Sequence, residues 1–411
     1  MLAKMAWRNL WRHKRRSLLT LLSIAFGGFL AILFTALQDR SFADFIDTAA
    51  RLGSGHVTIQ HPEYLETPTL NRTVQLTGQI RNLPERDRLV LHVTERITGQ
   101  AIVATANDSF GVVFIAYDPA RETEGTLTFG EGLIEGEMFK TANDRGIILG
   151  TKLAQNLGAG LGNKVVYTMT DRNGEIVSGM ARLTGVIETG APSLDQGLCL
   201  VPISALREVL NYGPNEATQI GIFLSDSRRS SLVASNLNRE LGPDSTALTW
   251  DEVQPDLSAF IAMKVGGARF MEILIAILVA AGIFNTLFVS VMERVREFGI
   301  MVAIGYSAGQ LFRLVMWESL WLALTGLAAC GALTIWPYYY LSQHGIDFSQ
   351  LVGGQDMEIA GVGFSPVVRV GIFPEHLIVI VLAIVAATLA AGLYPAWKAG
   401  KVEPVESISL V

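Results

Sequence analysis

Four stretches of the chain are apolar over a length that fits a lipid bilayer. A spanning helix needs about 20 mostly apolar residues, because the hydrocarbon core is about 30 Å thick and a helix rises about 1.5 Å per residue. The first stretch, Leu18 to Leu37, contains no charged residue, and the last ends at Pro395. The sequence therefore predicts four transmembrane helices, the last of them closed by Pro395. Their predicted ranges are 17–38, 269–292, 311–336 and 376–397.

Basic residues next to these stretches predict the orientation. Lys and Arg are enriched before the first stretch, between the second and third, and after the fourth. Because such residues favour the cytoplasmic side, both termini are expected in the cytoplasm. The segment 39–268 and the loop 337–375 are then outside, and the tail 398–411 is inside. A cleaved signal peptide is the alternative for the first stretch, but its apolar run is longer than a typical signal core, which favours an anchor.

The first 16 residues form a short pattern of their own. Lys4, Arg8 and Arg12 recur every four residues, as do Trp7 and Trp11. This spacing places a basic stripe and an aromatic stripe along one helix. Residues 1–16 are therefore predicted to be an amphipathic entry helix at the cytoplasmic interface, or simply a topological anchor.

The long outside segment has the pattern of a mixed α+β domain. Residues 55–60 alternate with a period of two, and residues 164–170 and 180–188 flank a turn with the Asn173-Gly174 signal of a hairpin. Further strands are predicted at 146–149, 198–201 and 219–224, and helices at 151–157, 202–211 and 228–241. The fold class is thus a four-helix membrane protein with an extracytoplasmic α+β domain between its first two helices.

Candidate chemistry in this domain is weak. The run Gly158 to Gly162 does not match the spacing of a phosphate-binding loop. His56, His61 and His92 lack the spacing of metal ligands, and Cys199 and Cys330 belong to different predicted regions, so no disulfide joins them. The formal net charge of −6 gives no reason to expect nucleic-acid binding. We predict no catalytic residue, no metal and no cofactor on this chain.

The segment 293–310, between the second and third stretches, is more specific. Charged residues at its start are followed by a short apolar run, then by Gly305 and by Ser307-Ala-Gly-Gln310, which has the form of a helix capping box. A short apolar helix between two membrane boundaries can pack into a groove of a cytoplasmic partner. An ordinary interfacial loop explains the pattern equally well on physical grounds alone.

Two motifs decide between these interpretations by resemblance. The string from Glu293 to Gly305 closely resembles the signature of the FtsX/MacB-like ABC transporter permease superfamily, in which this segment is a coupling helix that docks on the ATPase. The string from Tyr394 to Ile408 resembles the second signature of that family. By this resemblance the coupling residues are Glu293, Arg294, Arg296, Glu297, Phe298, Gly299, Ile300, Met301, Ile304 and Gly305. Those of the C-terminal signature are Tyr394, Pro395, Ala396, Pro404, Val405 and Glu406.

The resemblance also implies partners and a location. It implies a permease of the bacterial inner membrane that works with a cytoplasmic ABC ATPase dimer, which carries the ATP and Mg²⁺, and with a second permease, identical or homologous. The domain is most similar to lipoprotein-releasing permeases, in which a hairpin hands cargo to a periplasmic carrier. The hairpin here, Asp171 to Gly179, lacks the proline-bearing basic loop of the docking subunit. Efflux of antibiotics or peptides, and signalling to an envelope hydrolase, are the alternatives.

Small residues on two of the predicted helices suggest close packing. Gly27, Ala31 and Thr35 share one face of the first helix, and Ala383, Ala387 and Ala391 share one face of the fourth. Such faces let helix backbones approach each other in a membrane. They predict assembly of the helices and give no information about the cargo.

Overall fold

The computed structural model describes residues 2–12, 14–130, 132–348, 357–359, 362–364 and 367–401. The chain divides into two compact units. The first, called here the helical unit, comprises Met1–Ser41, Ala262–Asp347 and Val367–Val411. The second, the sheet domain, comprises Phe42–Ile261 and Phe348–Pro366.

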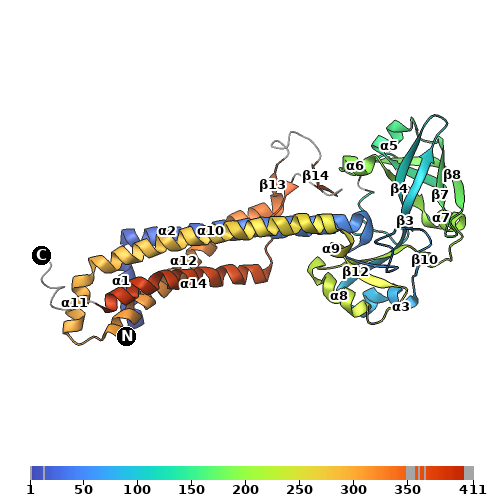
Figure 1. The fold of residues 1–411 in the computed structure, drawn as a ribbon. Coiled ribbons are helices and arrows are strands. Elements are labelled where there is room, and N and C mark those ends of the chain that lie inside the picture. Colours follow the sequence, from blue (N-terminus) through green and yellow to red (C-terminus); the bar gives the residue numbers. More distant parts are fainter. Residues whose placement is uncertain are drawn as a thin grey trace. The chain divides into compact units, whose positions relative to one another are not determined.

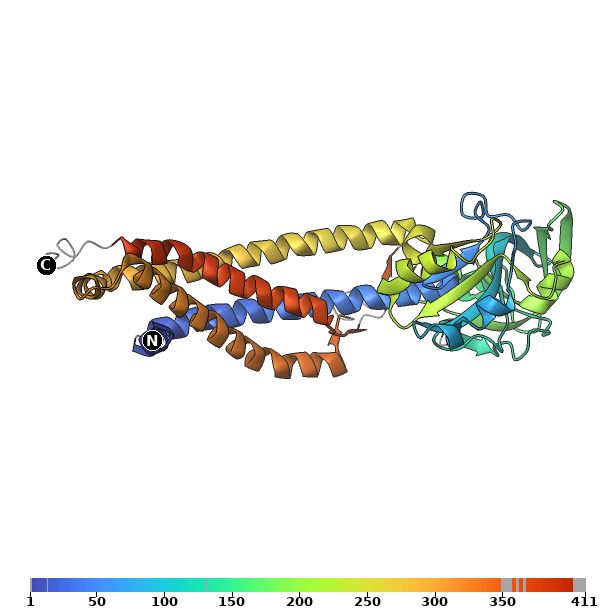
Figure 2. The ribbon, with the colours of Figure 1, turned by 90° about the horizontal axis from the view of Figure 1, so that it is seen from below.

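The helical unit is built around long apolar helices. Among the described residues, four helices are long and apolar enough to cross a membrane, as the sequence predicts. They are α2 (Lys14–Ala49), α10 (Pro255–Glu293), α12 (Ala308–His344) and α14 (Pro374–Gly400), and α1 (Leu2–Arg12) and α11 (Val295–Ala303) are shorter. In Figures 1 and 2 α1, α11 and the last turns of α14 lie at the same end of this unit.

These helices are longer than the predicted spans. α10 begins 14 residues before 269, and α12 continues through Pro337 to His344, so the first part of the expected loop 337–375 is helical. α14 does not close at Pro395 but continues to Gly400. Proline removes only one hydrogen bond of a helix, and the turn after Pro395 buries Ala396 and Ala399 completely, which compensates for that loss. Two short strands of this unit, β13 (Ile346–Asp347) and β16 (Val367–Val368), pair with each other. β14 (Met357–Ile359) and β15 (Val362–Phe364) form another pair and belong to the sheet domain.

Small residues bring the helices into contact. A methyl group added at Gly28 would lie 2.7 Å from Sγ of Cys330, and one at Gly326 would lie 2.6 Å from Cγ2 of Ile24. The face with Gly27 packs on α10, because a methyl group there would lie 2.5 Å from Cγ2 of Val279. The predicted face of α14 is only partly correct, since Ala391 is buried whereas Ala383 is exposed.

Polar side chains also join α2 to its neighbours. The hydroxyl of Thr35 donates to Oε1 of Glu272 on α10 at 2.9 Å. Asp39, which is buried, pairs with Nδ1 of His376 at 2.8 Å and accepts from the amide of Phe373 at 3.0 Å. These contacts satisfy the polar groups that the apolar helices carry.

The sheet domain contains a ten-stranded sheet. Its strands follow the order β12-β1-β11-β3-β4-β9-β6-β8-β5, and β7 pairs with both β3 and β8. The pairs β4–β9 and β6–β8 are parallel, and the other pairs are antiparallel. The strands of this sheet are β1 Val57–Gln60, β3 Val90–Ala104, β4 Ser109–Tyr117, β5 Leu133–Gly136, β6 Gly146–Gly150, β7 Lys164–Thr170, β8 Ile176–Ile187, β9 Leu198–Pro202, β11 Gln219–Leu224 and β12 Thr246–Thr249. A separate antiparallel pair is formed by β2 Val74–Gln75 and β10 Glu216–Ala217.

Pairing closes part of this sheet on itself. β3, β4, β9, β6, β8 and β7 pair in that order, and β7 returns to β3. Side chains such as Phe114, Leu149 and Val201 fill the interior and are buried. β1, β11, β12 and the start of β3 extend beyond this ring and bury a second apolar cluster, which includes Ile59, Ile222 and Leu237.

Short helices complete the domain and agree in part with the predictions. α7 (Ile203–Leu210) follows Pro202, and Asn211, with a φ of 56°, caps its C-terminal end. These bounds agree with the helix predicted at 202–211. The predicted helix 228–241 is a 3-10 turn, Ser227–Arg229, followed by α8 (Ser230–Leu237), and it ends early. The other helices are α3 Gly78–Arg81, α4 Leu83–Arg86, α5 Thr151–Asn156, α6 Pro192–Asp195 and α9 Trp250–Val253.

Candidate functional site

The predicted coupling segment forms a helix of its own between two sharp turns. α10 ends at Glu293, Arg294 leaves the helical conformation with a φ of −102°, and α11 follows from Val295 to Ala303. Gly305 then takes a φ of 107°, which side-chain-bearing residues rarely adopt. These two turns separate α11 from both long helices. α11 is thus shorter than the segment 293–310 that was predicted as a coupling helix.

The capping box predicted from the sequence is confirmed. The hydroxyl of Ser307 accepts from the amide of Gln310 at 3.3 Å, and the side chain of Gln310 accepts from the amide of Ser307 at 2.8 Å. α12 therefore begins at Ala308, three residues before the predicted span. The cap fixes the place where the chain leaves α11.

A buried ion pair anchors the start of α11. Nη1 of Arg294 lies 3.0 and 3.1 Å from the two oxygens of Glu318, and each side chain is only 9% exposed. Glu318 also accepts from the side-chain amide of Asn9 on α1 at 2.9 Å. Burial alone lowers the pKa of Arg294, but Glu318 and Glu297 raise it overall, so the guanidinium stays charged. One carboxylate thus connects α1, α11 and α12.

A second ion pair lies at the edge of this cluster. Oε2 of Glu297 is 3.1 Å from Nε of Arg294, and its Oε1 is 3.1 Å from Nη1 of Arg12 on α1. Arg12 is well exposed, so water screens this pair and it contributes little to stability. Its geometry nevertheless orients Glu297 between two guanidinium groups.

An apolar cluster packs beneath α11, against its buried face. Phe298 is fully buried, and the guanidinium of Arg294 lies 5.1 Å from the centre of its ring. Gly299 is also buried, and Met301 packs at the edge of the cluster. The other members come from α1, α10, α12 and α14; they are Ala6, Val291, Leu311, Leu314, Val315, Ala396 and Ala399.

The opposite side of α11 is open to solvent. Arg296 and Ile300 in α11 and Ile304, which caps the C-terminal end of α11, follow one another at intervals of four residues and therefore lie along one side of the helix. Ile300 is 47% exposed and Ile304 is 76% exposed. We call these three residues the exposed stripe. Large aliphatic side chains at an exposed helix face indicate a contact surface when they are grouped in this way.

The C-terminal signature contributes to the same end of the helical unit. Ala396 is fully buried in the cluster beneath α11, and Pro395 is buried as well. Tyr394 is about half exposed and lies against Phe284 and Phe288 of α10, with ring centres 6.0 and 5.9 Å apart. Pro404, Val405 and Glu406 lie outside the described residues.

Several residues of the site have no counterpart in the predicted set. Glu318, Asn9, Arg12 and Trp321 are the partners of α11 and α1, and Nε1 of Trp321 donates to the carbonyl of Ala3 at 3.1 Å. Glu318 could have been found, because a carboxylate inside a predicted span requires a buried partner. Asn9 carries no such signal, since its partner is 309 residues away in sequence.

The described residues contain no group of three or more His, Cys, Asp or Glu side chains that could hold a metal ion. His56 is buried and bonded to Asp47, with Nε2 2.9 Å from Oδ1. Both cysteines are free and buried, and burial raises the pKa of the Cys199 thiol. A protonated thiol is a poor nucleophile, so Cys199 has a packing role.

The chain has four long apolar helices, with the ringed sheet domain in the sequence between the first two. The short anchored helix α11 follows between the second and third. These features together define a class of membrane permease. Family models agree with this division. The FtsX-like permease C-terminal model matches residues 269–404, and the MacB-like periplasmic core domain model matches residues 17–240. The chain belongs to this family of ABC transporter permeases.

Named relatives share a low sequence identity with this chain, but the matches extend over most of it. LolC of Neisseria meningitidis, a lipoprotein-releasing system transmembrane protein, is 24% identical over 79% of each chain. PvdT of Pseudomonas entomophila, a pyoverdine export ATP-binding/permease protein, is 24% identical over 98% of this chain, which spans 59% of that protein. Among solved structures, the periplasmic region of MacB from Actinobacillus actinomycetemcomitans matches 51% of this chain and 94% of that structure, with 15% identity and a TM-score of 0.35.

Proposed function

We propose that this chain is the transmembrane subunit of an ABC transporter and that α11 is its docking helix for a cytoplasmic ATPase. The exposed stripe on α11 carries this proposal. Its two isoleucines are held outward by a buried ion pair and by Phe298, so the stripe is presented on a rigid base. An apolar, preorganised helix face fits a groove on a partner protein.

The proposal includes a location. The chain resides in the bacterial inner membrane with both termini in the cytoplasm and the sheet domain in the periplasm. Lys and Arg next to the long helices support this orientation, with Arg294, Arg296 and Arg313 around α11. ATP and Mg²⁺ are bound by the partner ATPase dimer, which drives a mechanical movement of the sheet domain, and a second permease, identical or homologous, completes the assembly.

The cargo we propose is a lipoprotein or another amphiphile extracted from the inner membrane. The match to LolC supports it, because that match covers most of both proteins. Efflux of a small molecule or peptide is the second candidate, supported by the PvdT match over 98% of this chain. Photo-crosslinking from α2 and α10 separates them: acylated proteins indicate lipoprotein release, and small amphiphiles indicate efflux.

Docking can be tested by pull-down from detergent-solubilised membranes of the native host. The wild-type chain should retain a soluble ABC ATPase that mass spectrometry identifies. Ile300→Asp and Ile304→Asp should each lower the retained ATPase at least tenfold, because a charge would be desolvated in the contact. Leu161→Asp is the matched control, since Leu161 is an aliphatic residue of the sheet domain with 46% exposure. Equal retention by all variants would remove α11 from the contact.

A further inference from the structure

Helix α2 changes its form at its C-terminal end, inside the sheet domain. Residues Ala50–Ser54 continue it as a π-helix, and the amide of Gly55 donates to the carbonyl of Ala50 at 2.9 Å. Ala49 and Ala50 are each 1% exposed. Gly55 has a φ of 71°, and a methyl group there would lie 2.8 Å from the amide nitrogen of Ile222. π-helical turns are rare and often mark functional positions.

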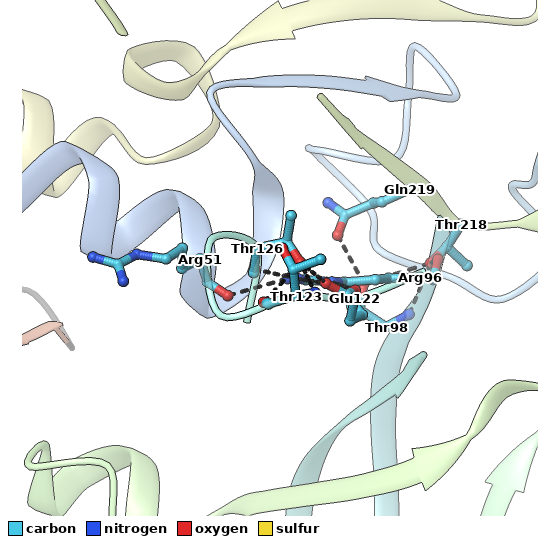
Figure 3. Close-up of polar contacts among 8 residues, drawn as sticks. All are labelled: Arg51, Arg96, Thr98, Glu122, Thr123, Thr126, Thr218 and Gln219. Carbon is cyan, nitrogen blue, oxygen red and sulfur yellow. Dashed lines mark hydrogen bonds and ion pairs between the residues drawn. The ribbon is translucent and has the colours of Figure 1, made fainter. Parts of the chain in front are cut away.

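A buried arginine holds this turn against the sheet (Figure 3). Arg96, on β3, donates from Nε to Oε1 of Glu122 at 2.8 Å and from Nη2 to Oε2 at 3.0 Å. Nη2 also donates to the carbonyl of Thr126 at 2.7 Å. Nη1 reaches the carbonyl of Arg51, in the π-helical turn, at 3.4 Å. One side chain therefore joins β3, the loop 122–126 and the end of α2.

The energetics of this arrangement suggest a role beyond stability. The side chains of Arg96 and Glu122 are 1% and 4% exposed, so both charges lose their hydration. A buried ion pair is often no more stabilising than well-packed apolar residues of the same volume. An apolar pair cannot fix the direction of its contacts. The planar guanidinium can, because it has five donors in a rigid fork. Arg96 uses that fork to define where Arg51 lies.

Two further contacts hold the same end of α2. Nδ1 of His56 accepts from the amide of Leu224 at 2.9 Å, so the ring proton is on Nε2, which donates to Oδ1 of Asp47 at 2.9 Å. Nε2 of Gln254, just before α10, donates to the carbonyl of Ala49 at 3.4 Å. The residues Asp47, Ala49, Arg51, His56, Arg96 and Gln254 are called here the α2 joint.

We infer that Arg96 is a positioning residue that locks the π-helical end of α2 to β3, so that a displacement of α2 moves the ringed sheet with it. This inference rests on the proposed function, because it concerns how movement driven by the ATPase reaches the sheet domain. The carboxylate of Glu122 and the carbonyl of Thr126 accept hydrogen bonds from the guanidinium of Arg96, and the carbonyl of Arg51 accepts a further one. Without Arg96 this end of α2 keeps the hydrogen bonds of His56 and Gln254 and the packing of Leu52.

Hydrogen exchange of the full chain in lipid nanodiscs tests the lock directly. Arg96→Lys keeps a charge opposite Glu122 but cannot form the fork. The double variant Arg96→Met with Glu122→Met keeps the packing without any charge. Amides of residues 50–55 should exchange at least tenfold faster in both variants than in the wild type. The control is Glu95→Met with Arg207→Met, which removes a buried pair from the neighbouring position of β3, with the side chains 3.1 Å apart.

Each outcome decides the matter. Faster exchange limited to residues 50–55 in the Arg96 variants supports the lock. Unchanged exchange there in the Arg96→Lys chain overturns it, as does an equal increase in the Glu95–Arg207 control. If the double variant, and no other, loses protection throughout the chain, the result for Arg96→Lys decides.

A second measurement addresses movement in the complex with its ATPase. In the Arg96→Lys complex, ATP hydrolysis should stay within twofold of wild type while release of a labelled host lipoprotein falls at least fivefold. Equal release by both complexes would show that the lock does not transmit movement. Failure of the wild-type chain to assemble with any ATPase would instead count against the proposed function, and the exchange result would still stand.

Discussion

At the scale of single residues, Gly305 is the clearest case of a conformational requirement. Its φ of 107° ends the turn after α11, and no atom of the described residues lies within 4 Å of where a methyl group would be added. Any effect of a substitution there must therefore come from the backbone and not from crowding. Gly309, in the first turn of α12, has equally open surroundings but an ordinary helical conformation.

This pair of glycines gives a matched prediction. Gly305→Ala should destabilise the helical unit by about 1–3 kcal/mol, because a side chain disfavours the positive φ. Gly309→Ala should be neutral or stabilise by up to about 1 kcal/mol, because alanine favours the helix. Thermal unfolding in detergent, followed by near-ultraviolet circular dichroism, measures both. If the two variants unfold at the same temperature, the turn does not depend on glycine.

At the scale of elements, Glu318 joins three helices through one carboxylate. Removing it leaves the buried guanidinium of Arg294 beside the partly exposed carboxylate of Glu297. Removing one member of a buried pair typically costs about 3–5 kcal/mol, whereas replacing both members by apolar residues is often neutral. Replacing both Arg294 and Glu318 is therefore expected to cost less stability than replacing Glu318 alone.

Glu318→Ala should accordingly lower the stability of the helical unit by about 3–5 kcal/mol. The double variant Arg294→Met with Glu318→Met should recover most of that loss, because no unpaired charge remains. Denaturant titration in mixed micelles, monitored by tryptophan fluorescence, compares the two. A double variant no more stable than Glu318→Ala would mean that the hydrogen bond from Asn9, and not the charge of Arg294, dominates the effect.

The sequence predicts many of these elements because their signals are local. The hairpin of β7 and β8 follows from the Asn173-Gly174 turn, and the capping box follows from Ser307 and Gln310. The long hairpin of β3 and β4 was not predicted. Glu95 and Arg96 stand in its middle and are both buried, so charged residues interrupt the expected apolar pattern. Their partners, Arg207 and Glu122, are distant in sequence, and no local rule identifies them.

The candidate site shows the same division between local and distant signals. The end of α11 and the turn that follows it could be anticipated from Gly305 and Ser307, whereas the turn at Arg294 could not. The exposed face could not, because which side of a short amphipathic helix is buried depends on α1 and α14, whose contacts are made only in the folded chain. Phe298 and Ile300 are both large and apolar, yet only Phe298 is buried.

At the scale of the whole molecule, the proposed orientation makes a prediction about access. Asn173, at the tip of the β7–β8 hairpin, and Lys4, in α1, are both exposed. Asn173→Cys should react with a membrane-impermeant maleimide in intact spheroplasts, and Lys4→Cys should react only after permeabilisation. The two native cysteines are buried and should give little background. Labelling of Lys4→Cys in intact spheroplasts would reverse the orientation.

The π-helical turn at Ala50–Ser54 also has an evolutionary consequence. Each of its hydrogen bonds spans one residue more than in an α-helix, so the turn is equivalent to a one-residue insertion at the end of α2. A homologue that lost this residue would end α2 in an ordinary α-helical turn, in which each amide bonds to the carbonyl four residues earlier instead of five. The carbonyls of that turn would point in other directions than those of the π-helical turn, so the carbonyl in place of that of Arg51 would no longer be directed at β3. Homologues with a single-residue gap at this point should therefore also lack the arginine found here at position 96.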